Sequence, residues 1–134
     1  MKLFIKLTVA LLLASLVLVG PAGAATNIST KTKLTASDKT IRVDQKVTFK
    51  VRVTSKNKKC FKNQKIKWFK NGHFKKYRQL NAKGKAKFTL NFPAAGTKKY
   101  QAKYPGREFG THPNHHICKK SHSKVIKIQV KPKK

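Results

Sequence analysis

The sequence predicts an all-β fold, in which two antiparallel sheets pack face to face as a sandwich of about seven to eight short strands. Three observations support this prediction. Apolar and polar residues alternate with a period of two in several separate runs, as in strands with one buried face. Turn-forming segments such as Asn71-Gly72 separate the runs. None of the runs has the period of an amphipathic helix longer than one turn.

The expected strands follow one another at short intervals along the chain. Clear alternation occurs at 47–54, 65–70, 85–90, 97–104 and 124–130, and weaker runs lie at 34–36, 41–43 and 77–80. Asn71-Gly72 predicts a tight hairpin turn after the second clear run. Parity places Val51, Trp68 and Ala102 in the core. The stretch from 105 to 122 lacks alternation and is expected to be irregular.

The order of several short motifs resembles the bacterial immunoglobulin-like repeat domain. These motifs are Leu34-Thr35-Ala36-Ser37 and the segments 43–49, 66–72, 84–86 and 95–106. The similarity covers nearly all of 25–134 and implies an immunoglobulin-like sandwich that acts as a non-catalytic spacer or binding unit. The family usually occurs as tandem copies and is often acidic or neutral, whereas this sequence has a single copy and is strongly basic.

Residues 1–24 have the pattern of a signal peptide. Two lysines, Lys2 and Lys6, precede an apolar run at 7–20, and the small residues Ala22-Gly23-Ala24 follow it. The run is shorter than the roughly 20 residues that cross a membrane as a helix. We therefore expect 25–134 to form one secreted domain without a transmembrane anchor, either extracellular or associated with the cell envelope.

The charge is heavily one-sided. The chain has 33 Lys and Arg side chains against three Asp and Glu, a formal net charge of +30, whereas most domains mix both signs. This balance predicts an anionic partner: a cell-wall polymer, a glycan, extracellular nucleic acid or an anionic lipid surface. Because 29 of the cations are Lys, which lacks the bidentate geometry of Arg, we expect no sequence-specific recognition of nucleic acid.

Parity places most of these cations on the outer faces of the two sheets. One sheet, expected from the 34–36, 47–54 and 85–90 strands and a fourth strand, carries Lys31, Lys33, Lys50, Arg52, Lys85 and Lys87. The other, expected from the 65–70, 97–104 and 124–130 strands, carries Lys65, Lys67, Lys99, Lys103 and Lys127.

Two loops are expected to meet at one end of the sandwich. In an immunoglobulin-like fold, the loops that follow the 47–54 and 97–104 strands emerge at the same end. These loops contain Cys60 and Cys118, and an even cysteine count behind a signal peptide predicts a disulfide between them. Loop lysines gather charge at the same end and form the predicted polyanion-binding site: Lys56, Lys58, Lys59, Lys62, Lys119 and Lys120.

Histidines near Cys118 raise the alternative of a metal site. The candidate ligands are His112, His115, His116 and His122, because imidazole and thiolate groups bind zinc and copper. The other interpretation is a set of solvated loop histidines beside a disulfide-bonded cysteine that has no thiolate to offer. Their spacing fits no standard zinc motif. We expect no bound metal and no cofactor.

The sequence does not indicate an enzyme. Asp38 and Asp44 are the only carboxylates close in sequence, and both are expected to form turns. No nucleophile elbow, phosphate-binding glycine loop or zinc-protease motif is present. The function predicted is a secreted binding or adhesion module with a polycationic surface. The alternative is a cationic effector acting on membranes or nucleic acid, although no amphipathic basic helix is visible.

For four aromatic residues the sequence leaves two alternatives, an exposed ring or a place in the core. Phe69, Phe74, Tyr77 and Phe109 lie among lysines, where exposed rings would stack on single-stranded bases. The alternative is that they belong to the core, because the alternation is unclear between 74 and 80.

Overall fold

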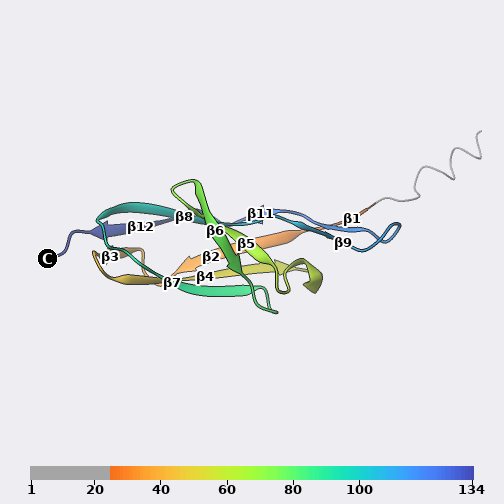
Figure 1. The fold of residues 1–134 in the computed structure, drawn as a ribbon, viewed down its shortest axis with the longest axis horizontal. Coiled ribbons are helices and arrows are strands. Elements are labelled where there is room, and N and C mark those ends of the chain that lie inside the picture. The colour runs from red at the N-terminus through yellow and green to blue at the C-terminus, as the bar shows by residue number, and fades with distance from the viewer. Residues whose placement is uncertain (1–24) are drawn as a thin grey trace, which may run out of the picture.

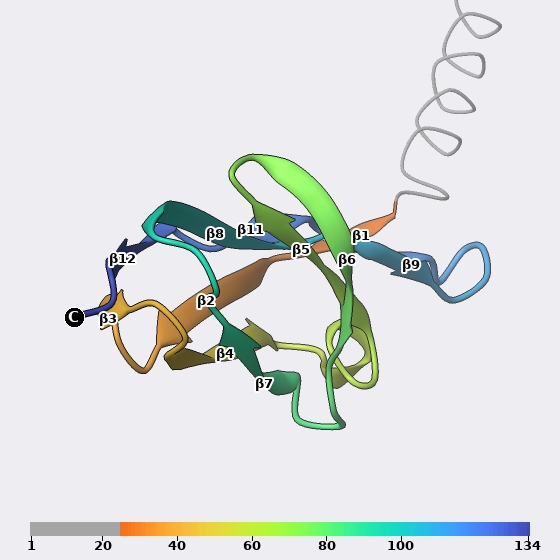
Figure 2. The ribbon, with the colours of Figure 1, turned by 60° about the vertical axis from the view of Figure 1, so that its left-hand side comes forward.

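The computed structural model describes residues 25–134, so the predicted signal peptide lies outside the described residues. Within 25–134 the chain forms two packed β-sheets and a smaller third sheet at one end (Figure 1). The two layers separate clearly in Figure 2, with β4 and β7 in one and β8 and β12 in the other. The predicted two-sheet sandwich is therefore confirmed.

The first layer is a three-stranded antiparallel sheet with the order β2-β4-β7. Its strands are β2 (Thr30–Ala36), β4 (Lys46–Ser55) and β7 (Lys85–Asn91). The fourth strand expected in this layer does not pair with it in the described part of the chain.

The second layer is a six-stranded sheet with the order β3-β12-β8-β5-β6, with β11 beside β8. Its strands are β3 (Thr40–Arg42), β5 (Lys65–Lys70), β6 (His73–Gln79), β8 (Gly96–Tyr104), β11 (Ser121–His122) and β12 (Ile126–Lys131). β3 pairs with β12 in parallel, unlike the other strand pairs of this sheet.

The hairpin predicted at Asn71-Gly72 connects β5 to β6. Asn71 has φ 52° and Gly72 has φ 80°, the left-handed conformations that a tight hairpin turn requires. β6 begins at His73, earlier than the weak 77–80 run indicated. The alternation was weak because nearly every side chain of this edge strand is exposed.

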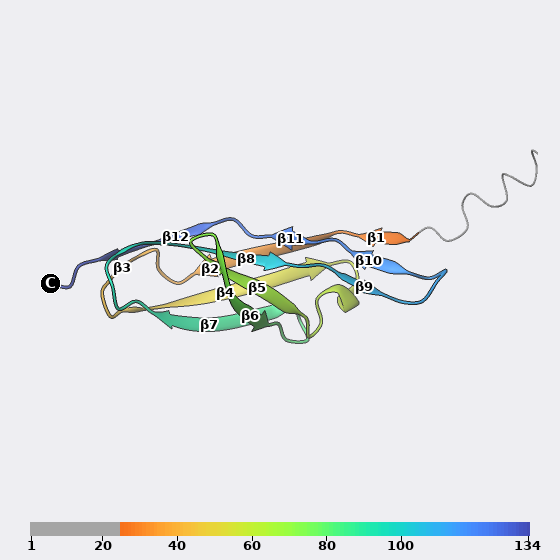
Figure 3. The ribbon, with the colours of Figure 1, turned by 45° about the horizontal axis from the view of Figure 1, so that its top comes forward.

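The expectation of an irregular 105–122 segment is wrong. β9 (Arg107–Phe109) and β10 (His116–Cys118) form an antiparallel hairpin, and β1 (Thr26–Ile28) pairs in parallel with β10. This small sheet extends from the end of the sandwich opposite the C-terminus (Figure 3). Strands this short cannot display alternation, and β1 is distant in sequence from its partner.

An aromatic cluster occupies the centre of the core. The Trp68 side chain is 2% exposed, and its ring centroid lies 5.1 Å from that of Phe49 and 5.2 Å from that of Tyr100. Phe88 of β7 adds a further ring to this cluster, and its centroid lies 4.7 Å from that of Trp68. The prediction that Trp68 belongs to the core is confirmed, and Val51 and Ala102 are buried as expected.

Candidate polyanion-binding surface

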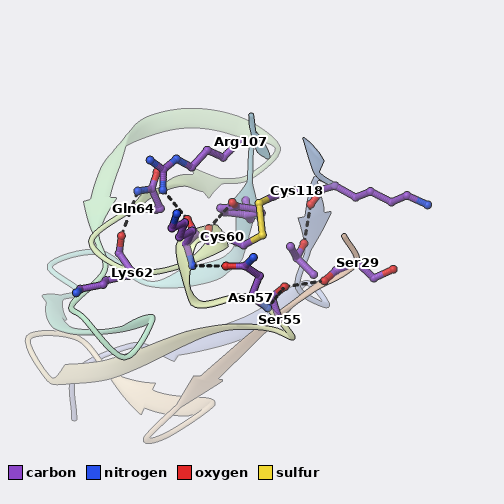
Figure 4. The surroundings of a disulfide bond; sticks show 12 residues. Ser29, Ser55, Asn57, Cys60, Lys62, Gln64, Arg107 and Cys118 are labelled. Atoms are coloured by element: carbon purple, nitrogen blue, oxygen red, sulfur yellow. Dashed lines mark hydrogen bonds between the residues drawn. A yellow bond between two sulfur atoms is a disulfide. The ribbon is translucent and has the colours of Figure 1, made fainter. Parts of the chain in front are cut away.

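A disulfide fixes the end of the sandwich at which the predicted site lies. Cys60 ends the short 3₁₀ helix η1 (Lys58–Cys60), and Cys118 ends β10. Their sulfur atoms are 2.06 Å apart and their Cα atoms 5.6 Å apart, and the bond appears in yellow in Figure 4. The bridge therefore connects the loop after β4 to the β9–β10 hairpin.

Hydrogen bonds hold η1 in place around the bridge. The Asn57 side chain accepts from the Lys59 backbone N–H at 2.9 Å, as an N-cap does. The Tyr104 hydroxyl donates to the Cys60 carbonyl inside the core. Burial raises the pKa of Tyr104 above its ordinary value of 10.0, and the Arg107 guanidinium opposes part of this shift. The loop is thus anchored to β8 as well as to β10.

The bridge brings part of the predicted lysine cluster together. Lys59 directly precedes Cys60 and Lys119 directly follows Cys118, so the two basic segments meet across the disulfide. Arg107 is the cross-strand partner of Cys118 and donates from Nη1 to the Lys59 carbonyl at 2.5 Å. We call Lys58, Lys59, Arg107 and Lys119 the tip cluster. Sequence reasoning missed Arg107, because nothing in an apparently irregular stretch indicated its direction.

The remaining predicted lysines lie around this cluster rather than in it. Lys56 and Lys62 are exposed on the loop segments before and after η1. Lys120 lines a hollow on the outer face of the six-stranded sheet, together with Lys67 and Lys103. The predicted site therefore extends over two surfaces of the molecule.

A second, more regular set of cations lies on the outer face of the three-stranded sheet. Lys33 is paired across strands with Arg52, and Arg52 with Lys85. In the next outward row, Lys50 of β4 pairs with Lys87 of β7. All five side chains are exposed. We call these five residues the cation ladder.

The face that carries the ladder has no acidic side chain. The outward positions of its three strands hold only Lys, Arg, Thr and Asn residues. The five ladder residues, with Thr35 and Asn81, line a shallow hollow of about 480 Å³. Like charges directly opposite each other destabilise a sheet. The ladder thus combines an electrostatic cost with an open anion-attracting surface.

The acidic side chains lie elsewhere. Glu108 pairs with His115 at 3.3 Å in the β9–β10 hairpin, and Asp44 pairs with Lys133 at 3.7 Å. Asp44 has φ 71° in a turn between β3 and β4, which agrees with its predicted role as a turn residue. Asp38 lies in the bend between β2 and β3.

The candidate metal ligands are engaged in separate contacts. His115 faces Glu108, the His116 ring stacks on Phe109 with centroids 4.9 Å apart, and His122 contacts Gln101 on β8. His112 is exposed at the hairpin tip. Among residues 25–134, no three His, Cys, Asp or Glu side chains gather in a way that could hold a metal ion.

The buried apolar side chains of residues 25–134 form a single core cluster. No helix in residues 25–134 is both long enough and apolar enough to cross a membrane. Exposed large apolar side chains remain at Phe74, Tyr77 and Val125, all on or beside the six-stranded sheet.

No protein-family model and no curated protein matches the sequence. Among solved structures, the chain is similar to a solution structure of the CARDB domain of a Pyrococcus furiosus protein, with a TM-score of 0.53 and 14% identity over 78% of this chain and 96% of that domain. A crystal structure of the same domain, in complex with di-metal ions, gives a TM-score of 0.50 at 14% identity, covering 77% and 93%.

The D0-D1 domains of intimin are also similar, with a TM-score of 0.46 and 14% identity over 72% of this chain and 46% of that chain. At these identities the likeness concerns the fold alone. Together with the two-layer topology, the CARDB comparison shows that this chain has an immunoglobulin-like fold.

Proposed function

We propose that this chain is a secreted, non-catalytic binding or adhesion module that attaches to anionic polymers of the cell envelope or matrix. The observation that carries the proposal is the cation ladder. Its cations stand directly opposite each other without an intervening acid. Solubility is served equally well by a surface of mixed sign, so an anionic ligand is the physical reason to maintain such an arrangement.

The ladder suits a polymer better than a single small anion. Neighbouring strands are about 4.8 Å apart, and outward residues on one strand are about 6.8 Å apart. Closely spaced phosphate or sulfate groups on one chain can therefore contact several cations at once. Each contact releases counterions, which supplies affinity without any directional readout. The predominance of Lys supports a preference for charge density over sequence.

The tip cluster provides a second contact in this proposal. Lys58, Lys59 and Lys119 are exposed beside the disulfide, and Arg107 donates to the Lys59 carbonyl. Lys56 and Lys62 add exposed charge on the loop segments before and after η1, and Lys120 adds charge on the neighbouring face of the six-stranded sheet. A disulfide fits the oxidising conditions outside the cytoplasm, where envelope polymers are encountered. The resemblance of the fold to immunoglobulin-like binding units supports the non-catalytic role.

The proposal can be tested by measuring heparin and duplex DNA affinity over a series of salt concentrations. The ladder variant Lys50→Gln/Lys85→Gln/Lys87→Gln removes three exposed charges, and the tip variant Lys58→Gln/Lys59→Gln/Lys119→Gln removes the same number. On duplex DNA each lost phosphate contact reduces the salt slope by about 0.9, so the ladder variant should lose up to about 2.7. The sequence favoured the loop lysines as the stronger contact. We now expect a smaller loss in the tip variant, because the tip lysines are not aligned in cross-strand rows as Lys50 and Lys87 are.

Two results would contradict the proposal. One is affinity for both polymers that is unaffected by either triple variant. The other is a neutral polymer that displaces heparin at equal concentration. Circular dichroism of each variant provides the control for folding, because all six substituted side chains are exposed.

A further inference from the structure

Three aromatic rings form an exposed strip on the outer face of β5 and β6. Phe74 is 47% exposed and Tyr77 is 52% exposed, and Phe69 is half-buried beside them. The Phe69 and Phe74 ring centroids are 5.9 Å apart, and those of Phe74 and Tyr77 are 5.2 Å apart, both in edge-on arrangements. We call these three residues the aromatic strip.

The strip follows from the local strand geometry. Trp68 points into the core, so its neighbour Phe69 points outward on β5. A register shift between Trp68 and Phe69 then pairs Phe69 with Phe74 of β6. Rings at these positions add nothing to the sandwich core. Exposed apolar surface that adjoins charged residues is typical of interaction sites.

Cations border the strip on the β8 side. Lys103 Nζ lies 4.4 Å from the centre of the Phe69 ring, and Lys103 is paired across strands with Lys67. Both lysines line a hollow of about 710 Å³, together with Phe69, Lys120 and His122. The face therefore places flat π surfaces directly beside a concave group of positive charges.

We propose that this face binds single-stranded nucleic acid, with phosphates in the hollow and unpaired bases on the aromatic strip. The inference rests on the proposed affinity for anionic polymers and names one class of them. A single strand alternates anionic phosphates with flat bases, and aromatic rings within a basic groove bind both. In a duplex the bases are paired and stacked, so they cannot reach the rings.

The charges on this face disfavour two other occupants. A second copy of the chain would bring Lys67 and Lys103 against their own equivalents. A flat bilayer surface would contact the exposed rings without entering the hollow, which would leave its lysines unused. A single strand is thin and flexible enough to engage the rings and the hollow together.

The first test compares oligothymidylate of about 15 nucleotides, near the upper end of known site sizes, with an abasic oligomer of the same length and charge. Stacking of even one base strengthens binding by about five-fold or more. We expect the intact protein to bind oligothymidylate at least that much more tightly. Binding of the abasic oligomer measures the electrostatic attraction of the phosphates to all the cationic faces, because this oligomer has no bases to stack on the rings.

The second test uses variants of the strip. Phe74→Leu/Tyr77→Leu retains apolar area but removes two π faces, and we expect it to reduce oligothymidylate affinity towards the abasic level. Its salt slope should be unchanged, because the phosphate contacts remain. Tyr77→Phe should bind like the wild type. Val125→Ala removes an exposed apolar side chain without a ring and serves as the matched control.

The outcomes separate this inference from the proposed function. The inference is overturned if the two oligomers bind with equal affinity and the strip variant does not change that affinity. If heparin binding in the same protein still depends on salt, the proposed function stands. Absence of any polyanion binding at low salt overturns both. Strip-dependent binding of phosphatidylglycerol vesicles, without preference for oligothymidylate, also overturns the inference and identifies a membrane-facing surface instead.

Discussion

At the scale of single residues, Tyr104 connects the core to the end that carries the tip cluster. Its side chain is 1% exposed, and its hydroxyl donates to the carbonyl of Cys60, next to the disulfide. Position 104 was predicted only as the end of a strand. Sequence parity placed the ring but contained no information about the partner of its hydroxyl, which lies 44 residues away.

Replacing this tyrosine should destabilise the domain. Tyr104→Phe leaves the Cys60 carbonyl buried without its donor, which costs about 1–3 kcal/mol. The free energy of unfolding, measured by urea denaturation, should fall by that amount. Tyr77→Phe is the control, because Tyr77 is 52% exposed and should be neutral. Equal stability of the two variants would show that the buried hydrogen bond contributes nothing.

The pH dependence of stability offers a second readout of the same side chain. Burial raises the pKa of Tyr104 in the folded state, so the folded protein retains the phenolic proton more strongly than the unfolded chain. This contribution is complete below the unfolded pKa of about 10 and is lost as the pH rises through the folded value. The wild type should therefore lose more stability than Tyr104→Phe above about pH 10.

At the scale of elements, the sequence predicts strands well where one face is buried. β4, β5, β7, β8 and β12 were all indicated by alternation, because their inward side chains form the core. β6 is an edge strand with exposed side chains on both faces, so the pattern that identifies strands is missing. β9 and β10 form a hairpin of three-residue strands, which are too short to display alternation. β1 pairs with the distant β10, and no local pattern encodes that pairing.

Turn geometry at this scale can be tested with two glycines. Gly84 has φ +76°, and an added Cβ would lie 2.6 Å from the Val53 carbonyl oxygen and 2.7 Å from the Phe61 ring. Gly72 has φ +80° but open space around it. Ala in either left-handed position costs about 1–2 kcal/mol. Gly84→Ala should lower the urea midpoint clearly more than Gly72→Ala, because only Gly84 adds a steric clash.

An equal effect of the two glycine variants would contradict this assignment. It would mean that backbone conformation alone determines the cost and that the turn can move away from Val53 and Phe61. Because both glycines are in turns between strands, the comparison separates close packing from left-handed backbone conformation.

At the scale of the whole molecule, the sequence predicts which side chains are basic and on which face they lie. It does not predict register, and register decides that Lys50 stands opposite Lys87 rather than opposite a threonine. The same limit applies to the strip, where a register shift places Phe69 opposite Phe74. The cation ladder and the aromatic strip thus depend on strand pairing, which local sequence patterns do not specify.

A final prediction about stability follows from the like-charge pairs of the cation ladder. At low salt, Lys87→Gln should raise the free energy of unfolding by about 0.2–1 kcal/mol, because it removes repulsion from Lys50 across the strands. Added salt screens exposed charges, so the gain should shrink as ionic strength increases. Lys133→Gln is the control: it removes an exposed ion pair with Asp44, which contributes little stability, so no gain is expected. If Lys87→Gln is no more stable than the wild type at any salt concentration, the ladder carries no electrostatic cost, and its strongest support for an anionic ligand is lost.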